Sequence, residues 1–182
     1  SVTVKDGALQ KFLSYGKHTY KAEHSMYESK SGTFEIGESK VNVNVDLTPI
    51  FGFLKITTAP EAGADIFLNG RKIGKSPFST ESLVEGDYTL KVVKEMYDSE
   101  EKAVTVARNK PTQVELSMQP AFGNVTISTS DANASLILDG KELGKGTWTG
   151  RVERGKHILE AKRVNHRTAS KTIDVMANTQ PK

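Results

Sequence analysis

Apolar residues recur at every second position in short runs along the chain, and no window shows a sustained helical period. In the clearest run, small polar residues separate four apolar ones, Val41, Val43, Val45 and Leu47. Successive side chains of a β-strand point to opposite faces, so such a run predicts a strand with one buried face. Similar runs surround Leu54, Leu90 and Val114, and Asn69-Gly70 and Asp139-Gly140 are typical of two-residue hairpin turns. The pattern predicts an all-β protein made of small antiparallel β-sandwiches.

The strand pattern itself repeats along the chain, at spacings of 69 to 71 residues. Residues 52–56 (Gly-Phe-Leu-Lys-Ile) match residues 123–127 (Gly-Asn-Val-Thr-Ile), and a phrase of Gly-x-(Tyr/His) begins at Gly16, Gly86 and Gly155. A period of this kind indicates an array of modules. We predict three units: a partial first repeat over 1–50, a complete second repeat over 51–120, and a third repeat over 121–182 that lacks its last strand.

The joints between the repeats are short. About five residues separate Leu47 from Phe53 and Met118 from Asn124, with one proline in each joint. A flexible tether needs a longer Gly/Ser stretch, so we expect the sandwiches to form a fairly rigid rod. The outer repeats are incomplete unless Val2–Val4 is a strand remnant, and the chain begins without Met or a signal-like segment. We therefore expect a processed or excised part of a longer protein with flanking repeats.

The motifs of the second repeat carry a family resemblance. Pro60-Glu61-Ala62-Gly63-Ala64 is followed by the Asn69-Gly70 hairpin, then Gly74-Lys75-Ser76-Pro77, Gly86-Asp87-Tyr88 and Met96-Tyr97. This series resembles the PEGA domain family, with an extra Ala in the name-giving tetrapeptide and Met in place of the Gly before Tyr97 and Tyr27. The third repeat departs further, with Ser130-Asp131-Ala132-Asn133-Ala134 at the signature and Asn165-His166 at the Gly-Tyr position. The resemblance implies a cell-envelope or secreted bacterial protein and no catalytic activity.

Composition narrows the function classes. The 25 basic and 22 acidic residues are mixed along the chain, and no Lys/Arg run or aromatic RNA-binding motif is present, so nucleic acid is not an expected partner. The absence of cysteine excludes disulfides, thiol nucleophiles and Cys-ligated zinc. The longest apolar stretch is a few residues, far short of the roughly 20 that a membrane-spanning helix needs.

Histidine pairs are the usual start of a metal or acid–base site. His18 and His157 occupy the repeat position that holds Tyr88 in the second repeat, and His166 occupies that of Tyr27 and Tyr97. An exchange between Tyr and His indicates a packing site with a polar tip rather than a metal ligand. His24 has no equivalent in the other copies and no ligand partner at a suitable spacing.

Two further groups of residues suggest chemistry. The carboxylates Asp98, Glu100 and Glu101 would suit glycoside hydrolysis, yet a solvated loop between strands explains them as well. Trp148 and Tyr15 would suit sugar stacking. Trp148 aligns with Phe78 and is expected to close the end of a sandwich, whereas Tyr15 is the better candidate for an exposed ring.

These observations favour a non-catalytic module of the cell envelope or extracellular space, acting as a spacer or as an interaction surface in adhesion or assembly. The alternative is a carbohydrate-binding module of a surface protein. We expect no catalytic residues, cofactor or metal, and the partner would be an unidentified protein or a surface polysaccharide. An enzyme is the third hypothesis, and only the Asp98–Glu101 acids and the scattered histidines support it.

Overall fold

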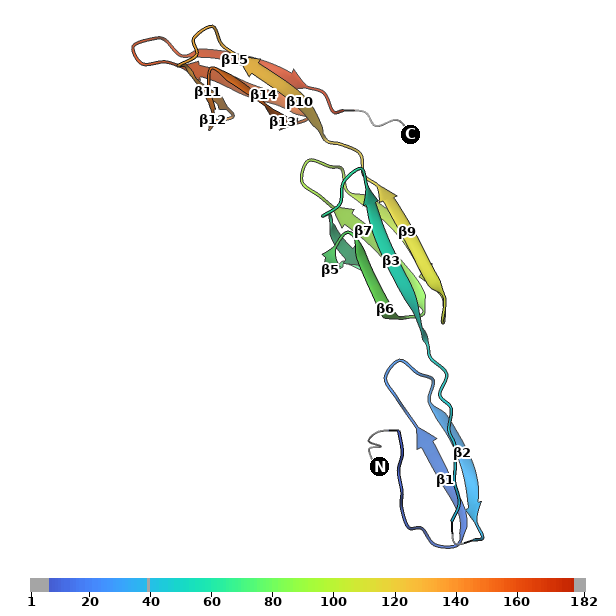
Figure 1. Cartoon of the computed structure of the whole chain (residues 1–182). Helices are drawn as coiled ribbons and strands as arrows, with labels where there is room; N and C mark the ends of the chain where they lie inside the picture. Colours follow the sequence, from blue (N-terminus) through green and yellow to red (C-terminus); the bar gives the residue numbers. More distant parts are fainter. Residues whose placement is uncertain (1–6, 39, 179–182) are drawn as a thin grey trace.

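The chain forms an elongated row of three groups of strands in a computed structural model, which describes residues 7–38 and 40–178 (Figure 1). These residues contain the strands β1 to β15 and no helix. No helix capable of crossing a membrane is therefore found in the described part of the chain. The prediction of an all-β chain of tandem modules is confirmed, whereas Val2–Val4 lie outside the described residues.

The middle module is a complete two-layer sandwich. Its strands are β3 (Phe51–Ala59), β4 (Asp65–Leu68), β5 (Arg71–Lys75), β6 (Phe78–Val84), β7 (Gly86–Val93), β8 (Glu100–Val106) and β9 (Pro111–Ser117). One sheet has the order β6-β3-β9 and the other β5-β4-β7-β8. The alternating apolar residues of both sheets meet in the core, where the most buried side chains are Leu54, Ile56, Ile66, Leu90 and Val92.

One pairing in this module departs from the antiparallel expectation. Strands β3 and β9 run parallel, from the pair Phe53 and Pro111 to the pair Ala59 and Ser117. Alternation shows which face of a strand is buried but contains no information about the direction of its neighbour. The other strand pairs of the described residues are antiparallel.

The C-terminal module repeats this plan without one strand. It contains β10 (Phe122–Ser128), β11 (Ser135–Leu138), β12 (Lys141–Lys145), β13 (Thr147–Glu153), β14 (Gly155–Lys162) and β15 (Ala169–Val175). Its sheets have the orders β10-β13 and β12-β11-β14-β15. A counterpart of β9 is therefore missing among the described residues, and β10 pairs with β13 alone.

The N-terminal segment contains β1 (Gly16–Ala22) and β2 (Lys30–Ile36). The first residue pair of this hairpin is Gly16 with Ile36. The corresponding pairs are Gly86 with Val106 in the β7–β8 hairpin and Gly155 with Val175 in the β14–β15 hairpin. The same hairpin thus occurs three times. The prediction of a strand over 41–47 is wrong, because these residues belong to no strand. Their counterpart β9 is hydrogen-bonded to β3, and the described N-terminal residues provide no equivalent of β3 as a partner.

Backbone conformation confirms the turn predictions. Asn69 and Gly70 have φ angles of 48° and 78°, and Asp139 and Gly140 have 47° and 82°. Both dipeptides therefore have the two positive φ angles of the hairpin turn that matches strand twist. Positive φ angles of 66°, 64° and 62° also occur at the position before the repeated Tyr or His, which is occupied by Met26, Met96 and Asn165.

Candidate functional site at the joints between modules

The most regular feature outside the sandwiches is the connection between consecutive modules. At the second joint, Pro120 forms a β-bridge with Tyr97, and the Ala121 N–H donates to the Met96 carbonyl at 2.8 Å. The Arg154 N–H then donates to the Ala121 carbonyl, also at 2.8 Å. The linker is therefore hydrogen-bonded to the module before it and to the module after it.

The first joint has the same backbone pattern. Pro49 bridges Tyr27, the Ile50 N–H donates to Met26 at 2.9 Å, and the Glu85 N–H donates to Ile50 at 2.8 Å. Each linker thus uses one residue after its proline as both a donor and an acceptor. Since these bonds are made by the backbone, they persist although the linker sequences differ.

An aromatic contact lies beside each bridge. The rings of Tyr97 and Phe122 meet edge to face with centroids 5.6 Å apart, and those of Tyr27 and Phe51 do so at 5.8 Å. Phe122 is only 4% exposed although it begins the C-terminal module, because it packs into the core cluster of the middle module. The ring of each following module therefore covers the end of the one before.

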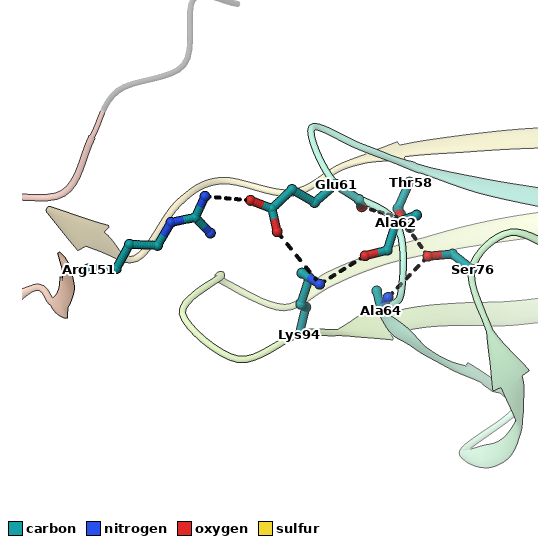
Figure 2. A network of polar contacts seen from close by, with 7 residues as sticks. All are labelled: Thr58, Glu61, Ala62, Ala64, Ser76, Lys94 and Arg151. Atoms are coloured by element: carbon teal, nitrogen blue, oxygen red, sulfur yellow. Dashed lines mark hydrogen bonds and ion pairs between the residues drawn. The ribbon is translucent and has the colours of Figure 1, made fainter. Parts of the chain in front are cut away.

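A polar network surrounds the second joint, and Figure 2 shows it reaching from the family signature to the next module. Arg151 of β13 contacts the Glu61 carboxylate at 2.7 Å, and its guanidinium lies 4.4 Å from the centre of the Phe122 ring. Lys94 lies 3.7 Å from the other Glu61 oxygen and donates to the Ala62 carbonyl at 2.8 Å. Glu61 of the signature thus contacts a cation of its own module and one of its neighbour.

The base of this network is anchored inside the middle module. The Thr58 hydroxyl donates to the Glu61 carbonyl at 2.7 Å and lies 2.6 Å from the Ser76 hydroxyl. Ser76 is buried and accepts the Ala64 N–H at 3.1 Å. These bonds hold the signature loop in the position from which the Glu61 carboxylate contacts Arg151 of the C-terminal module.

The ionic contacts shift the pKa of the groups involved. Hydrogen bonds from Arg151 and then Tyr97 hold the pKa of the Glu61 carboxyl below its ordinary value. Burial, and then the hydrogen bond to Glu61, raises the pKa of the Tyr97 hydroxyl. Glu61 is therefore a carboxylate and Tyr97 a neutral phenol at neutral pH, which is the pairing that the network requires.

The two joints differ in their outer ion pairs. At the second joint, Arg154 binds Asp98 through two bonds of 2.8 Å. At the first joint, the residues at the same repeat positions are both acidic, Glu85 and Glu28, and Arg108 binds both of them. An arginine lies between the modules at both joints. Arg108 comes from the loop between β8 and β9, whereas Arg154 comes from the turn between β13 and β14.

The acids that are candidates for glycoside hydrolysis lie in different elements of the fold. Asp98 belongs to the joint, while Glu100 and Glu101 begin strand β8, so the expectation that they form a loop is wrong for these two residues. Glu101 lies opposite Lys91 in the neighbouring strand β7. One of the three carboxylates therefore lies at the joint and the other two lie in a strand of the middle module.

The histidines occupy the places that the comparison of repeats predicted, with one exception. His18 and His157 lie 2.8 Å from the carbonyl four residues earlier, which is the bond that the Tyr88 hydroxyl makes at 2.7 Å. His166 is exposed, so the expectation that it packs like Tyr97 is wrong. Tyr97 is covered by the next module, and the described residues contain no module after His166.

The remaining candidate residues are also placed. Tyr15 is 72% exposed, as expected, and Trp148 is half-buried with its ring over Gly150. His24 is exposed and lies against Tyr27 with ring centroids 5.0 Å apart. No group of three or more potential metal ligands occurs in the residues that the structure describes.

The strand order of the modules and the backbone bonds at their joints define a tandem-repeat β-sandwich protein with short, hydrogen-bonded joints. The family model described as "PEGA domain" matches residues 51–121 and again residues 122–182. The chain belongs to the PEGA domain family, which confirms the resemblance found in the sequence; it is not a known catalytic family.

Solved structures with some likeness to the chain are distant. The Bacillus anthracis TIE protein is 16% identical with a TM-score of 0.37, and the match covers 84% of this chain and 35% of that one. A DUF3823 family protein from Bacteroides ovatus is 14% identical with a TM-score of 0.30, covering 69% of this chain and 97% of that one. The chain thus spans only 35% of the length of the Bacillus anthracis TIE protein structure. No curated protein matches the chain.

Proposed function

We propose that this chain is a non-catalytic spacer of the bacterial cell envelope or extracellular space, which holds whatever it joins at a fixed separation. The observation that carries the proposal is the repeated joint, where backbone hydrogen bonds connect each linker to both of its modules. A flexible tether lacks such bonds and samples many orientations. We also propose that residues 1–50 are a partial repeat, because the β1–β2 hairpin has the register of its two counterparts.

Small-angle X-ray scattering of the whole chain tests the rod. We expect a narrow, extended particle with the profile of the row in Figure 1. A compact particle, or a profile that only an ensemble of bent shapes can fit, would contradict the proposal.

A matched pair of insertions sharpens this test. A Gly-Ser-Gly-Ser insert between Gln119 and Pro120 interrupts the second joint and should shorten the average particle. The same insert after Gly140 lengthens an exposed hairpin turn and should leave the overall profile unchanged. Equal effects of the two inserts would show that the joint does not set the shape.

Carbohydrate binding is the second candidate, and the exposure of Tyr15 supports it. One exposed ring at 72% exposure offers an apolar face for a sugar. Isothermal titration with soluble envelope polysaccharides, using wild type and Tyr15→Ala, tests this candidate. Binding that Tyr15→Ala removes would favour it, and the absence of heat with wild type would exclude it for those glycans.

A further inference from the structure

The chain enters and leaves the middle module through two strands that lie side by side. Strand β3 follows the first linker directly, and β9 ends just before the second linker. The two strands pair in parallel over seven residue pairs, from Phe53 with Pro111 to Ala59 with Ser117. Because parallel strands point the same way, the start of β3 and the end of β9 lie at opposite ends of the pair (Figure 1).

Tension along the chain therefore pulls the two strands past each other. It pulls β3 backward from its first residue and β9 forward from its last residue, so that the load runs along the strands. The hydrogen bonds of a parallel pair are evenly spaced along its length, and in this geometry they share the load. Unfolding then requires these bonds to break together, whereas a pair that is pulled apart sideways loses its bonds one after another.

Further contacts hold β9 in its register. The Phe53 N–H donates to the Lys110 carbonyl at 3.1 Å, and the Met118 N–H donates to the Ala59 carbonyl at 2.8 Å. The hydrogen bonds thus extend one residue beyond each end of β9. Leu116 and Met118 are 2% and 1% exposed, so sliding of this strand would also bring core side chains into water.

We propose that the middle module bears tension along the chain, and that the β3–β9 pair is the element that resists it. Forced unfolding depends on the rate of crossing the unfolding barrier, so the direction of the load matters as well as the stability of the module. The inference goes beyond the spacer proposal and does not rest on it, because a module resists stretching whether its joints are rigid or flexible. Scattering tests the joints, and pulling tests the module.

Single-molecule force spectroscopy with two pairs of attachment points tests the direction of the load. The chain has no cysteine, so handles can be attached to introduced ones. The pair Lys55→Cys and Ser117→Cys pulls β3 and β9 along their length, as tension through the linkers does. The matched pair Lys55→Cys and Gln113→Cys pulls at two residues directly opposite each other and draws the strands apart. All three side chains are exposed, so the core is unchanged.

We expect the first pair to require a several-fold higher unfolding force than the second at the same loading rate. Without handles, the two double variants should have the same free energy of unfolding in urea, so that the difference in force arises from the direction of pulling. Equal forces, a lower force along the strands, or a difference in force that a difference in stability accounts for would overturn the proposal.

A pair of proline variants tests whether the hydrogen bonds between β3 and β9 carry the load. Successive N–H groups of a strand point to opposite sides, and the Met118 N–H points toward β3. The N–H of Val114 therefore also faces β3, and that of Glu115 faces away. With handles at Lys55→Cys and Ser117→Cys, Val114→Pro should lower the unfolding force, whereas Glu115→Pro should change it far less. Equal forces in the two proline variants would contradict the assignment.

Discussion

Replacing Phe122 by alanine should loosen the second joint more than removing either of its ion pairs. Phe122 is 4% exposed, packs into the core cluster of the middle module and meets the Tyr97 ring at 5.6 Å. A Phe→Ala change in a buried site costs about 3–5 kcal/mol. The edge-to-face contact with Tyr97 accounts for roughly 0.5–1.5 kcal/mol beyond the buried area.

The ion pairs of the joint are weaker by comparison. The side chains of Arg154 and Asp98 are 54% and 43% exposed, and those of Arg151 and Glu61 are 46% and 33% exposed. Pairs at this exposure contribute about 0–1 kcal/mol each, because water screens the charges. The stacking of Arg151 on Phe122 adds about 0.5–1 kcal/mol, which is also lost in the Phe122→Ala variant.

Pulsed electron–electron double resonance measures how much each substitution loosens the second joint. Spin labels on Lys72→Cys and Lys141→Cys report the distance between the middle and C-terminal modules, and both positions are exposed. We expect a broader distance distribution for Phe122→Ala and a smaller change for Arg154→Ala. Phe51→Ala, at the other joint, is the control and should leave this distribution unchanged. A distribution that broadens more with Arg154→Ala than with Phe122→Ala would refute the reasoning.

Three further changes test the modules themselves. Gly123→Ala places a Cβ 2.6 Å from the Met176 carbonyl oxygen and should destabilise the C-terminal module by about 1–3 kcal/mol in chemical unfolding, whereas Gly37→Ala, with no atom nearby, should be neutral. Asn69→Ala keeps a φ of 48° without a side chain suited to it and should cost about 1–2 kcal/mol, and Asn69→Gly should cost less. In thermal melts at varied pH, His157→Tyr should remove a contribution that exists between the ordinary pKa values of aspartate and histidine, 3.8 and 6.5. The hydrogen bond between the two side chains raises the pKa of His157, so the contribution of His157 to folding stability is complete below pH 6.5 and is lost as pH rises through the raised pKa. The same bond lowers the pKa of Asp139, so the contribution of Asp139 to folding stability is complete above pH 3.8 and is lost as pH falls through the lowered pKa. An unchanged pH profile would show that this pair does not stabilise the fold.

Local features of the fold could be predicted from the sequence because they depend on neighbouring residues. Alternation identifies the faces of strands such as β7, and Asn-Gly or Asp-Gly specifies a turn by its tolerance of positive φ. The pairing of β3 with β9 could not be predicted in this way, because more than fifty residues separate Phe53 from Pro111. The strand expected at 41–47 failed for the same reason, since a strand requires a partner as well as a suitable sequence.

The candidate site was only partly accessible to sequence analysis. Comparison of repeats showed that Tyr97 and Tyr27 hold equivalent positions, but not that Phe122 and Phe51 cover them. The signal was present in the repeated Phe after each linker proline. The contact between Glu61 and Arg151 has no counterpart among the described residues of the first joint, so comparison of the repeats could not reveal it.

The contrast between the two joints indicates which contacts set the geometry of the rod. The backbone bonds around Pro49 and Pro120 and the edge-to-face ring pairs are the same at both joints. The ion pairs differ, since Arg108 joins two acidic residues at one joint and Arg154 binds Asp98 directly at the other. Contacts that vary while the backbone pattern stays constant cannot be the cause of that pattern. The charged residues therefore adapt to an arrangement that the linker and the rings impose, which explains how modules of different surface composition can be joined in one elongated array (Figure 1).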